Sequence, residues 1–110
     1  MTNKERLEIV NAARSYERII GERRGYFVKS LSLAREKRQT EAVEERKKYH
    51  DSKARANKSE KLLAERIYHE HDFVRVDDVV YMAYSTETLL RIPLDMAPDL
   101  AQEGAAQATE

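Results

Sequence analysis

The chain contains no cysteine and no tryptophan, and only three glycines and two prolines among its 110 residues. Without cysteine it has no disulfide, no thiolate metal ligand and no cysteine nucleophile. So few glycines leave little room for a phosphate-binding loop, and neither a Walker A nor a Gly-x-Gly-x-x-Gly motif occurs. These absences exclude several classes of cofactor-binding protein and enzyme.

Long hydrophobic runs are also lacking. The longest uncharged run in the apolar part of the chain is Val79–Thr86, whereas a transmembrane helix needs about 20 residues. The first residues, MTNKER, lead into no apolar stretch, so we expect no secretory signal. The sequence therefore predicts a cytoplasmic protein that does not contact a membrane.

Charge is abundant, with 20 basic and 20 acidic side chains that cancel overall. They do not cancel locally, because residues 20–61 hold thirteen bases and seven acids whereas residues 62–110 hold three bases and ten acids. Such asymmetry indicates contact with a nucleic acid, a membrane or an acidic protein surface, or contact between the basic part of one copy and the acidic part of another. A solvated helical surface of mixed charge is the simpler alternative.

Residues 2–71 predict helix. They contain no proline and are rich in Glu, Arg, Lys, Ala and Leu, which favour that structure. Thr2 with Glu5 three positions later is a capping-box pattern at the start. Gly21 and Gly25 interrupt the segment and predict a kink or a close helix crossing.

The apolar positions of this segment, among them Ile20, Phe27 and Leu31, follow a heptad-like seam that changes phase near residue 38. Residues on the two sides of the break, such as Phe27 and Tyr49, have numbers that sum to about 76, as facing residues of an antiparallel hairpin do. The sequence therefore predicts a coiled-coil-like helical hairpin with arms 3–37 and 41–71. Thr40, followed by acidic residues, is the expected cap of the second arm.

Residues 72–94 predict a three-stranded antiparallel β-meander, with strands near 73–76, 79–84 and 89–94 and a tight turn at Asp77-Asp78. The middle strand is apolar on both faces, so we expect one face to pack on the hairpin and the other on a second copy of the chain. Residues 95–110 are small, acidic and aperiodic, and predict a disordered tail.

The sequence thus predicts an α+β fold with three parts: a helical hairpin over 1–71, a meander over 72–94 and a flexible acidic tail over 95–110. Its expected oligomeric state is a homodimer that forms through the strands. The predicted oligomer interface consists of Val79, Val80, Tyr81, Met82, Tyr84, Leu90 and Ile92.

The arms of the hairpin carry the predicted partner-binding residues, chosen because arginine and aromatic side chains dominate the energetics of interfaces. These residues are Tyr16, Tyr26, Arg23, Arg24, Arg35, Arg38, Lys47 and Lys48. We expect the partner to be another protein, met in an assembly, adaptor or inhibitory role. The alternative is a nucleic-acid-binding accessory protein that uses the basic arms over 23–61.

The sequence gives little indication of a metal site or a catalytic site. Glu65, His69, His71 and Asp72 are metal-ligand types, but helical side chains two residues apart point about 200° away from each other. No serine lies in a Gly-x-Ser-x-Gly elbow. The sequence predicts no metal, no cofactor, no catalytic residue and no enzymatic activity.

Overall fold

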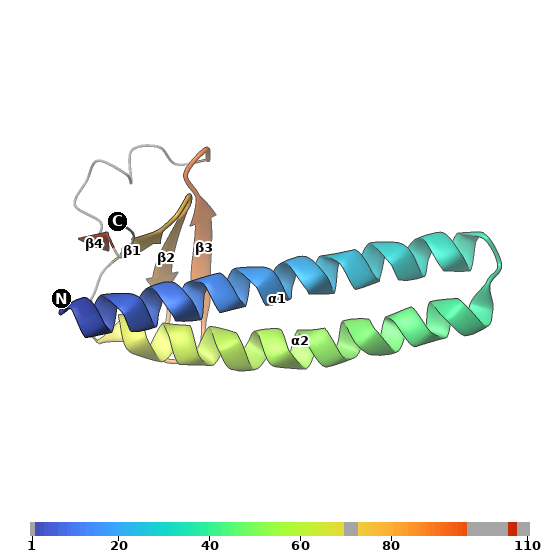
Figure 1. Cartoon of the computed structure of the whole chain (residues 1–110), viewed down its shortest axis with the longest axis horizontal. Coiled ribbons are helices and arrows are strands. Elements are labelled where there is room, and N and C mark those ends of the chain that lie inside the picture. The colour runs from blue at the N-terminus through green and yellow to red at the C-terminus, as the bar shows by residue number, and fades with distance from the viewer. Residues whose placement is uncertain (1, 70–72, 97–105, 108–110) are drawn as a thin grey trace. The chain divides into compact units, whose positions relative to one another are not determined.

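The computed structural model of the chain describes residues 2–69, 73–96 and the backbone of 106–107 (Figure 1). Two long helices come first and short strands follow, which confirms the predicted α+β hairpin and meander. The elements are α1 (Asn3–Arg35), α2 (Gln39–Tyr68), β1 (Val74–Val76), β2 (Val79–Ala83), β3 (Leu89–Pro93) and β4 (Ala106–Gln107).

The chain divides into two compact units, and both long helices contribute to each of them. The root unit comprises Met1–Ser15 and Ser59–Glu110, so it holds the strands and the outer ends of both helices. The tip unit is Tyr16–Lys58 and contains only helix and the connection between α1 and α2.

The connection at the tip is a Schellman motif. The N–H of Lys37 donates to the carbonyl of Ala34 at 3.0 Å, and the N–H of Arg38 donates to the carbonyl of Leu33 at 2.9 Å. Lys37 takes the left-handed conformation that this motif requires, with a φ of 63°. The helix therefore reverses at the place where the phase of the apolar positions breaks.

Replacing Lys37 by glycine is expected to raise the free energy of unfolding by about 0.5–1 kcal/mol, because glycine adopts positive φ without a clash at Cβ. Urea unfolding followed by circular dichroism measures the change. Lys37→Ala is the control, since it removes the same charge but keeps the Cβ. If Lys37→Ala raised the free energy of unfolding as much as Lys37→Gly does, the conformational explanation would be contradicted.

The predicted cap of the second arm is wrong. The carbonyl of Arg38 accepts the N–H of Ala42 at 3.0 Å, so α2 begins at Gln39 and Thr40 lies inside its first turn instead of capping it. A Cβ built on Gly21 or Gly25 would meet nothing within 4 Å, so the described residues make no close crossing at either glycine. The alternative of a kink at these glycines stays a prediction.

The cores of the two units differ in polarity. The helical part of the root unit buries apolar side chains only: Ile9, Val10, Ala13, Leu63, Ala64 and Ile67. In the tip unit Ile19, Ile20 and Ala56 form a small cluster against which Tyr16 packs. Nearer the turn, the tip unit buries the polar residues Ser30, Glu45 and Ser52 together with the apolar Leu33 and Ala42.

These buried polar residues depart from the seam that the sequence predicts. The predicted seam contains Leu31, yet Leu31 is 50% exposed and Ser30 beside it is 6% exposed. The hydroxyl of Ser30 donates to the carbonyl of Phe27 at 2.8 Å, and the hydroxyl of Ser52 donates to the carbonyl of Tyr49 at 2.9 Å. Each serine satisfies its hydroxyl within its own helix, which lets a small polar residue occupy the seam.

The sheet has the strand order β3-β2-β1-β4. The predicted antiparallel meander of β1, β2 and β3 is confirmed, and Val76 pairs with Val79 across the Asp77-Asp78 turn. Asp77 has a φ of 55°, as the first central residue of a tight hairpin turn requires. The short strand β4 pairs in parallel with β1 inside the segment predicted to be a disordered tail. The rest of that tail beyond Met96 lies outside the described residues.

The outer edge of β3 is partly closed. The hydrogen-bonding pattern with β2 turns the backbone of Leu89, Arg91 and Pro93 toward this edge. The N–H of Leu89 donates to Glu60 Oε2 at 3.0 Å, and Pro93 has no N–H to offer. Pairing of another strand at this edge is therefore hindered.

Candidate functional site

The boundary between the two units also separates the charges. The tip unit holds thirteen bases and seven acids, whereas the root unit holds seven bases and thirteen acids. The tip unit thus has a formal charge of +6 and the root unit a formal charge of −6. All eight predicted partner-binding residues lie in the positively charged tip unit.

One flank of the tip unit, which we call the paired flank, holds the ion pairs between its described residues. Arg55 reaches from α2 to Glu22 of α1, with 3.4 Å between Nη2 and Oε2. Lys29 of α1 reaches Glu45 of α2 at 3.5 Å between Nζ and Oε1. These pairs join the two helices and neutralise charges of both signs.

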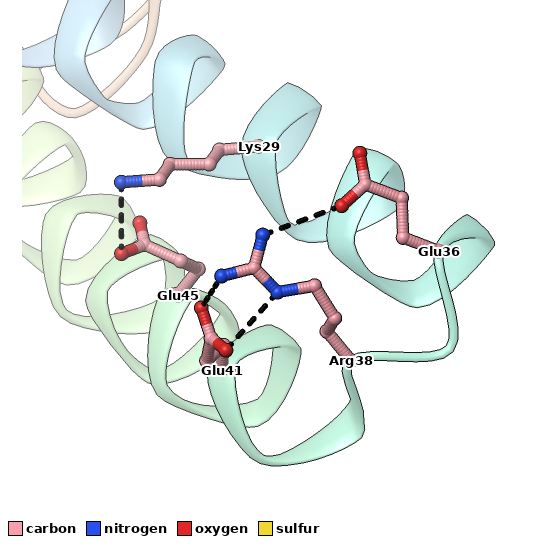
Figure 2. Close-up of polar contacts among 5 residues, drawn as sticks. All are labelled: Lys29, Glu36, Arg38, Glu41 and Glu45. Atoms are coloured by element: carbon pink, nitrogen blue, oxygen red, sulfur yellow. Dashed lines mark hydrogen bonds and ion pairs between the residues drawn. The ribbon is translucent and has the colours of Figure 1, made fainter.

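Arg38 closes the paired flank at the turn (Figure 2). Its guanidinium lies between the carboxylate of Glu36 at the end of α1, 3.4 Å away, and the carboxylate of Glu41 in the first turn of α2. The Nε–H of Arg38 donates to Glu41 Oε1 at 3.0 Å, and an Nη2–H donates to the other oxygen. This predicted partner-binding residue is therefore engaged within its own chain.

Glu45 is the most buried charged side chain on this flank, with 8% of its side chain exposed. Its Oε1 accepts a hydrogen bond from Lys48 Nζ at 3.0 Å. Figure 2 shows the same oxygen facing Lys29. The hydrogen bond from Lys48 holds the pKa of Glu45 below its ordinary value, against burial that raises it. Glu45 therefore stays ionised, and Lys48 is occupied in neutralising it.

The opposite flank carries no acidic side chain between residues 18 and 58, all of which the structure describes. Its position follows from the turn of about 100° per residue in each helix and from the contact of Phe27 with Tyr49. On α1 this flank ends at Glu17, which lies two helical turns before Arg24 on the same side of the helix. This acid-free flank consists of Arg24, Phe27, Leu31 and Arg35 on α1 and of Arg46, Tyr49 and Lys53 on α2.

The predicted partner-binding residues do not form one surface. Arg24 and Arg35 are exposed on the acid-free flank, whereas Arg38 and Lys48 belong to the paired flank. Lys47 is exposed on the outer side of α2, and Tyr16, Arg23 and Tyr26 are half-buried. The sequence prediction omits Arg46, Lys53 and Leu31, which a helical projection of both arms in their antiparallel register would have grouped with Arg24 and Arg35.

The seven residues of the predicted oligomer interface fall into a group that is buried within the single chain and a group that is at least partly exposed. Val79 is 9% exposed, and Val80 and Tyr81 have no exposed surface within the single chain. Tyr84 is 72% and Leu90 38% exposed, while Met82 and Ile92 are half-buried. Met82 pairs with Leu90 in the register of β2 and β3, so their side chains share one face of the sheet.

A bidentate ion pair links α1 to the β1–β2 turn inside the root unit. Arg14 Nε donates to Asp77 Oδ2 at 3.1 Å, and Nη2 donates to Oδ1 at 3.0 Å. These hydrogen bonds from Arg14 hold the pKa of Asp77 below its ordinary 3.8, although burial acts in the opposite direction. Both side chains are more than half exposed, so solvent weakens the pair.

A depressed pKa in the folded state means that Asp77 stabilises the protein above pH 3.8, and that this contribution disappears as the pH falls through the folded-state pKa. We expect Asp77→Asn to lower the free energy of unfolding at pH 7 by about 0.5 kcal/mol. The difference from the wild type should vanish at a pH below the folded-state pKa. Urea unfolding at a series of pH values measures it, with Asp78→Asn as control. Equal pH dependence in the two variants would contradict the role of Arg14.

A shallow hollow in the root unit, of about 260 Å³, is lined by Glu5, Glu8, Ile9, Glu65, Arg66 and His69. Arg66 Nη1 lies 2.6 Å from Glu8 Oε2 and neutralises one of its acids. Within the described residues no group of three or more His, Asp or Glu side chains is placed to hold a metal ion. Of the four residues of metal-ligand type that the sequence brings close together, His71 and Asp72 lie outside the described residues.

Neither helix in the described part of the chain combines the length and apolarity needed to cross a bilayer. No family model, no curated protein and no solved structure matches the chain. Function is therefore argued from the geometry of the two units.

Proposed function

We propose that the protein is a non-catalytic interaction protein of the cytoplasm that binds another protein in an assembly, adaptor or inhibitory role. The observation that carries the proposal is the tip unit, a basic helical hairpin with exposed apolar and aromatic side chains. Phe27 is 46%, Val28 55% and Leu31 50% exposed on α1. Exposed apolar side chains close to unpaired arginines are typical of protein-binding surfaces.

The proposal includes self-association through the root unit, with a homodimer favoured. Met82, Tyr84, Leu90 and Ile92 supply apolar surface on the strands. The closed edge of β3 favours contact through the face of the sheet over pairing of strands between copies. Sedimentation equilibrium at tens of micromolar tests this part, and a monomer would overturn it.

Affinity capture from the native host tests the binding of another protein. The full chain is used as bait, with and without nuclease, and any recovered protein is then purified and recombined with it. We expect at least one protein to remain captured after nuclease treatment and to form a complex of fixed stoichiometry with the purified chain. Loss of every captured protein on nuclease treatment would overturn the proposal.

The charge of +6 on the tip unit supports a second candidate, a nucleic-acid-binding accessory protein that uses the arms over 23–61. Duplex binding would weaken steeply with salt, because each neutralised phosphate releases condensed counterions. Acids interspersed along both arms oppose this candidate. No mobility shift of a random duplex at low salt would eliminate it.

A further inference from the structure

We infer that the acid-free flank of the tip unit is the docking surface for an acidic amphipathic helix of the partner protein. This inference rests on the proposed function and adds to it the surface and the chemistry of the partner.

The first argument is the separation of charge between the two flanks. Acids of the tip unit beyond Glu17 either pair with bases on the paired flank, as Glu22, Glu36 and Glu45 do, or project from that side of the hairpin. On the acid-free flank, Arg24, Arg35, Arg46 and Lys53 are exposed and make no ion pair with a described residue. A ligand there meets four cations that no described acidic side chain neutralises.

The second argument is the apolar strip between these cations. Phe27 and Leu31 lie one turn apart on α1 and are 46% and 50% exposed. The ring of Tyr49 on α2 lies 5.6 Å from that of Phe27, centroid to centroid. The strip is thus bordered by arginines on α1 and by Arg46 and Lys53 on α2. An amphipathic helix that lays apolar side chains on such a strip is a recurrent mode of peptide recognition.

The spacing of the cations suits a helix. Arg24 and Arg35 are separated by about 16 Å along α1, and Arg46 and Lys53 by about 10 Å along α2, at 1.5 Å per residue. Carboxylates two to three turns apart on both margins of a partner helix can reach them. The burial of Phe27 and Leu31 would strengthen binding, and the ion pairs would set its register and its specificity.

Two other occupants fit less well. Nucleic acid gains nothing from Leu31, an aliphatic side chain on which a base does not stack as it does on an aromatic ring. A second copy that presented the same flank would bring arginines against arginines, since all four charged groups of the flank are basic. A partner with acidic margins and an apolar stripe satisfies both the charges and the apolar strip.

The test uses fluorescence anisotropy of a labelled synthetic helix of about 18 residues, with leucine at three- and four-residue spacing, glutamate on both margins and alanine elsewhere. Two control peptides replace every glutamate by lysine or every leucine by alanine. With the full chain at low salt, we expect both controls to bind at least about tenfold more weakly, because the surface requires charge and apolar contact together.

Variants of the protein locate the surface. Arg46→Glu should weaken binding of the acidic peptide by about tenfold or more, and Leu31→Ala by about fivefold. Lys58→Glu is the matched control, since Lys58 is exposed on α2 outside the acid-free flank and the change in net charge is the same. It should alter the affinity by less than about twofold. Thermal unfolding followed by circular dichroism confirms that each variant is folded.

Three results would overturn the inference. The acidic peptide could fail to bind better than its controls, or Arg46→Glu and Lys58→Glu could weaken binding equally, as net charge alone would dictate. A single-stranded 20-mer DNA could bind more tightly than the peptide and lose that binding in Arg46→Glu, which would assign the flank to nucleic acid. Failure of the peptide while capture still yields a nuclease-resistant protein complex would refute this surface and leave the proposed function standing.

Discussion

Leu63→Ala should lower the free energy of unfolding by about 2–5 kcal/mol, one of the two largest effects we expect. Leu63 lies in the root unit and has no exposed surface, like Ala64 and Ile67 near it on α2. Its truncation removes buried methyl groups and leaves a cavity that two long helices cannot readily close. Urea unfolding followed by circular dichroism measures the loss.

The neighbouring residue supplies the matched control. Leu62 is 52% exposed, and Leu62→Ala makes the same chemical change in the same helical turn. We expect it to alter the free energy of unfolding by no more than about 0.5 kcal/mol. Similar losses in the two variants would contradict the packing of α2 against α1 in the root unit.

Val80→Asp should have the other large effect. We expect it to lower the free energy of unfolding by about 3–5 kcal/mol, because it buries an unpaired charge. Val80 has no exposed surface within the single chain. The destabilisation should therefore be as large in a dilute, monomeric sample as in a concentrated one. Urea unfolding at low and high protein concentration measures it, and a stable Val80→Asp variant would contradict the burial of β2.

Met82→Asp separates folding from self-association. Met82 is half-buried and its side chain is on the same face of the sheet as that of Leu90. We expect this variant to stay folded but to sediment as a monomer, since a charge in an apolar interface opposes the contact. A Met82→Asp variant with the mass of the wild type would refute the sheet face as the dimer interface.

The hairpin was predictable because its cause is local. A long segment of helix-forming residues without proline must be helical, and a phase break in its apolar positions must be a turn or a stutter. The left-handed residue of the reversal is Lys37, next to the predicted phase break near residue 38. The exact start of α2 was not predictable from Thr40, because the reversal uses backbone hydrogen bonds from Lys37 and Arg38 in place of a capping side chain.

The polar seam of the tip unit shows where pattern reasoning fails. A count of apolar positions favours Leu31 in the seam, yet Ser30 and Ser52 occupy it because each hydroxyl is satisfied by a carbonyl of its own helix. Glu45 is tolerated there because Lys29 and Lys48 both reach it. The hydrogen bonds and ion pairs that permit this arrangement depend on three-dimensional contacts.

The candidate surface was predictable only in part. The surplus of bases and the aromatic residues of the arms are visible in the sequence, and they led to Arg24 and Arg35. The sequence also pairs Phe27 with Tyr49, and the contact between their rings confirms this pair. A projection of both arms in that register would have added Arg46 and Lys53 to the predicted surface.

The sequence by itself determined the class of elements, the place of the reversal and the excess of positive charge on the arms, because periodicity, helix propensity and composition act along the chain. Only the tertiary structure decided which cations are neutralised and which remain exposed. That decision depends on distances between side chains far apart in sequence, and ion pairing falls off steeply with distance in water.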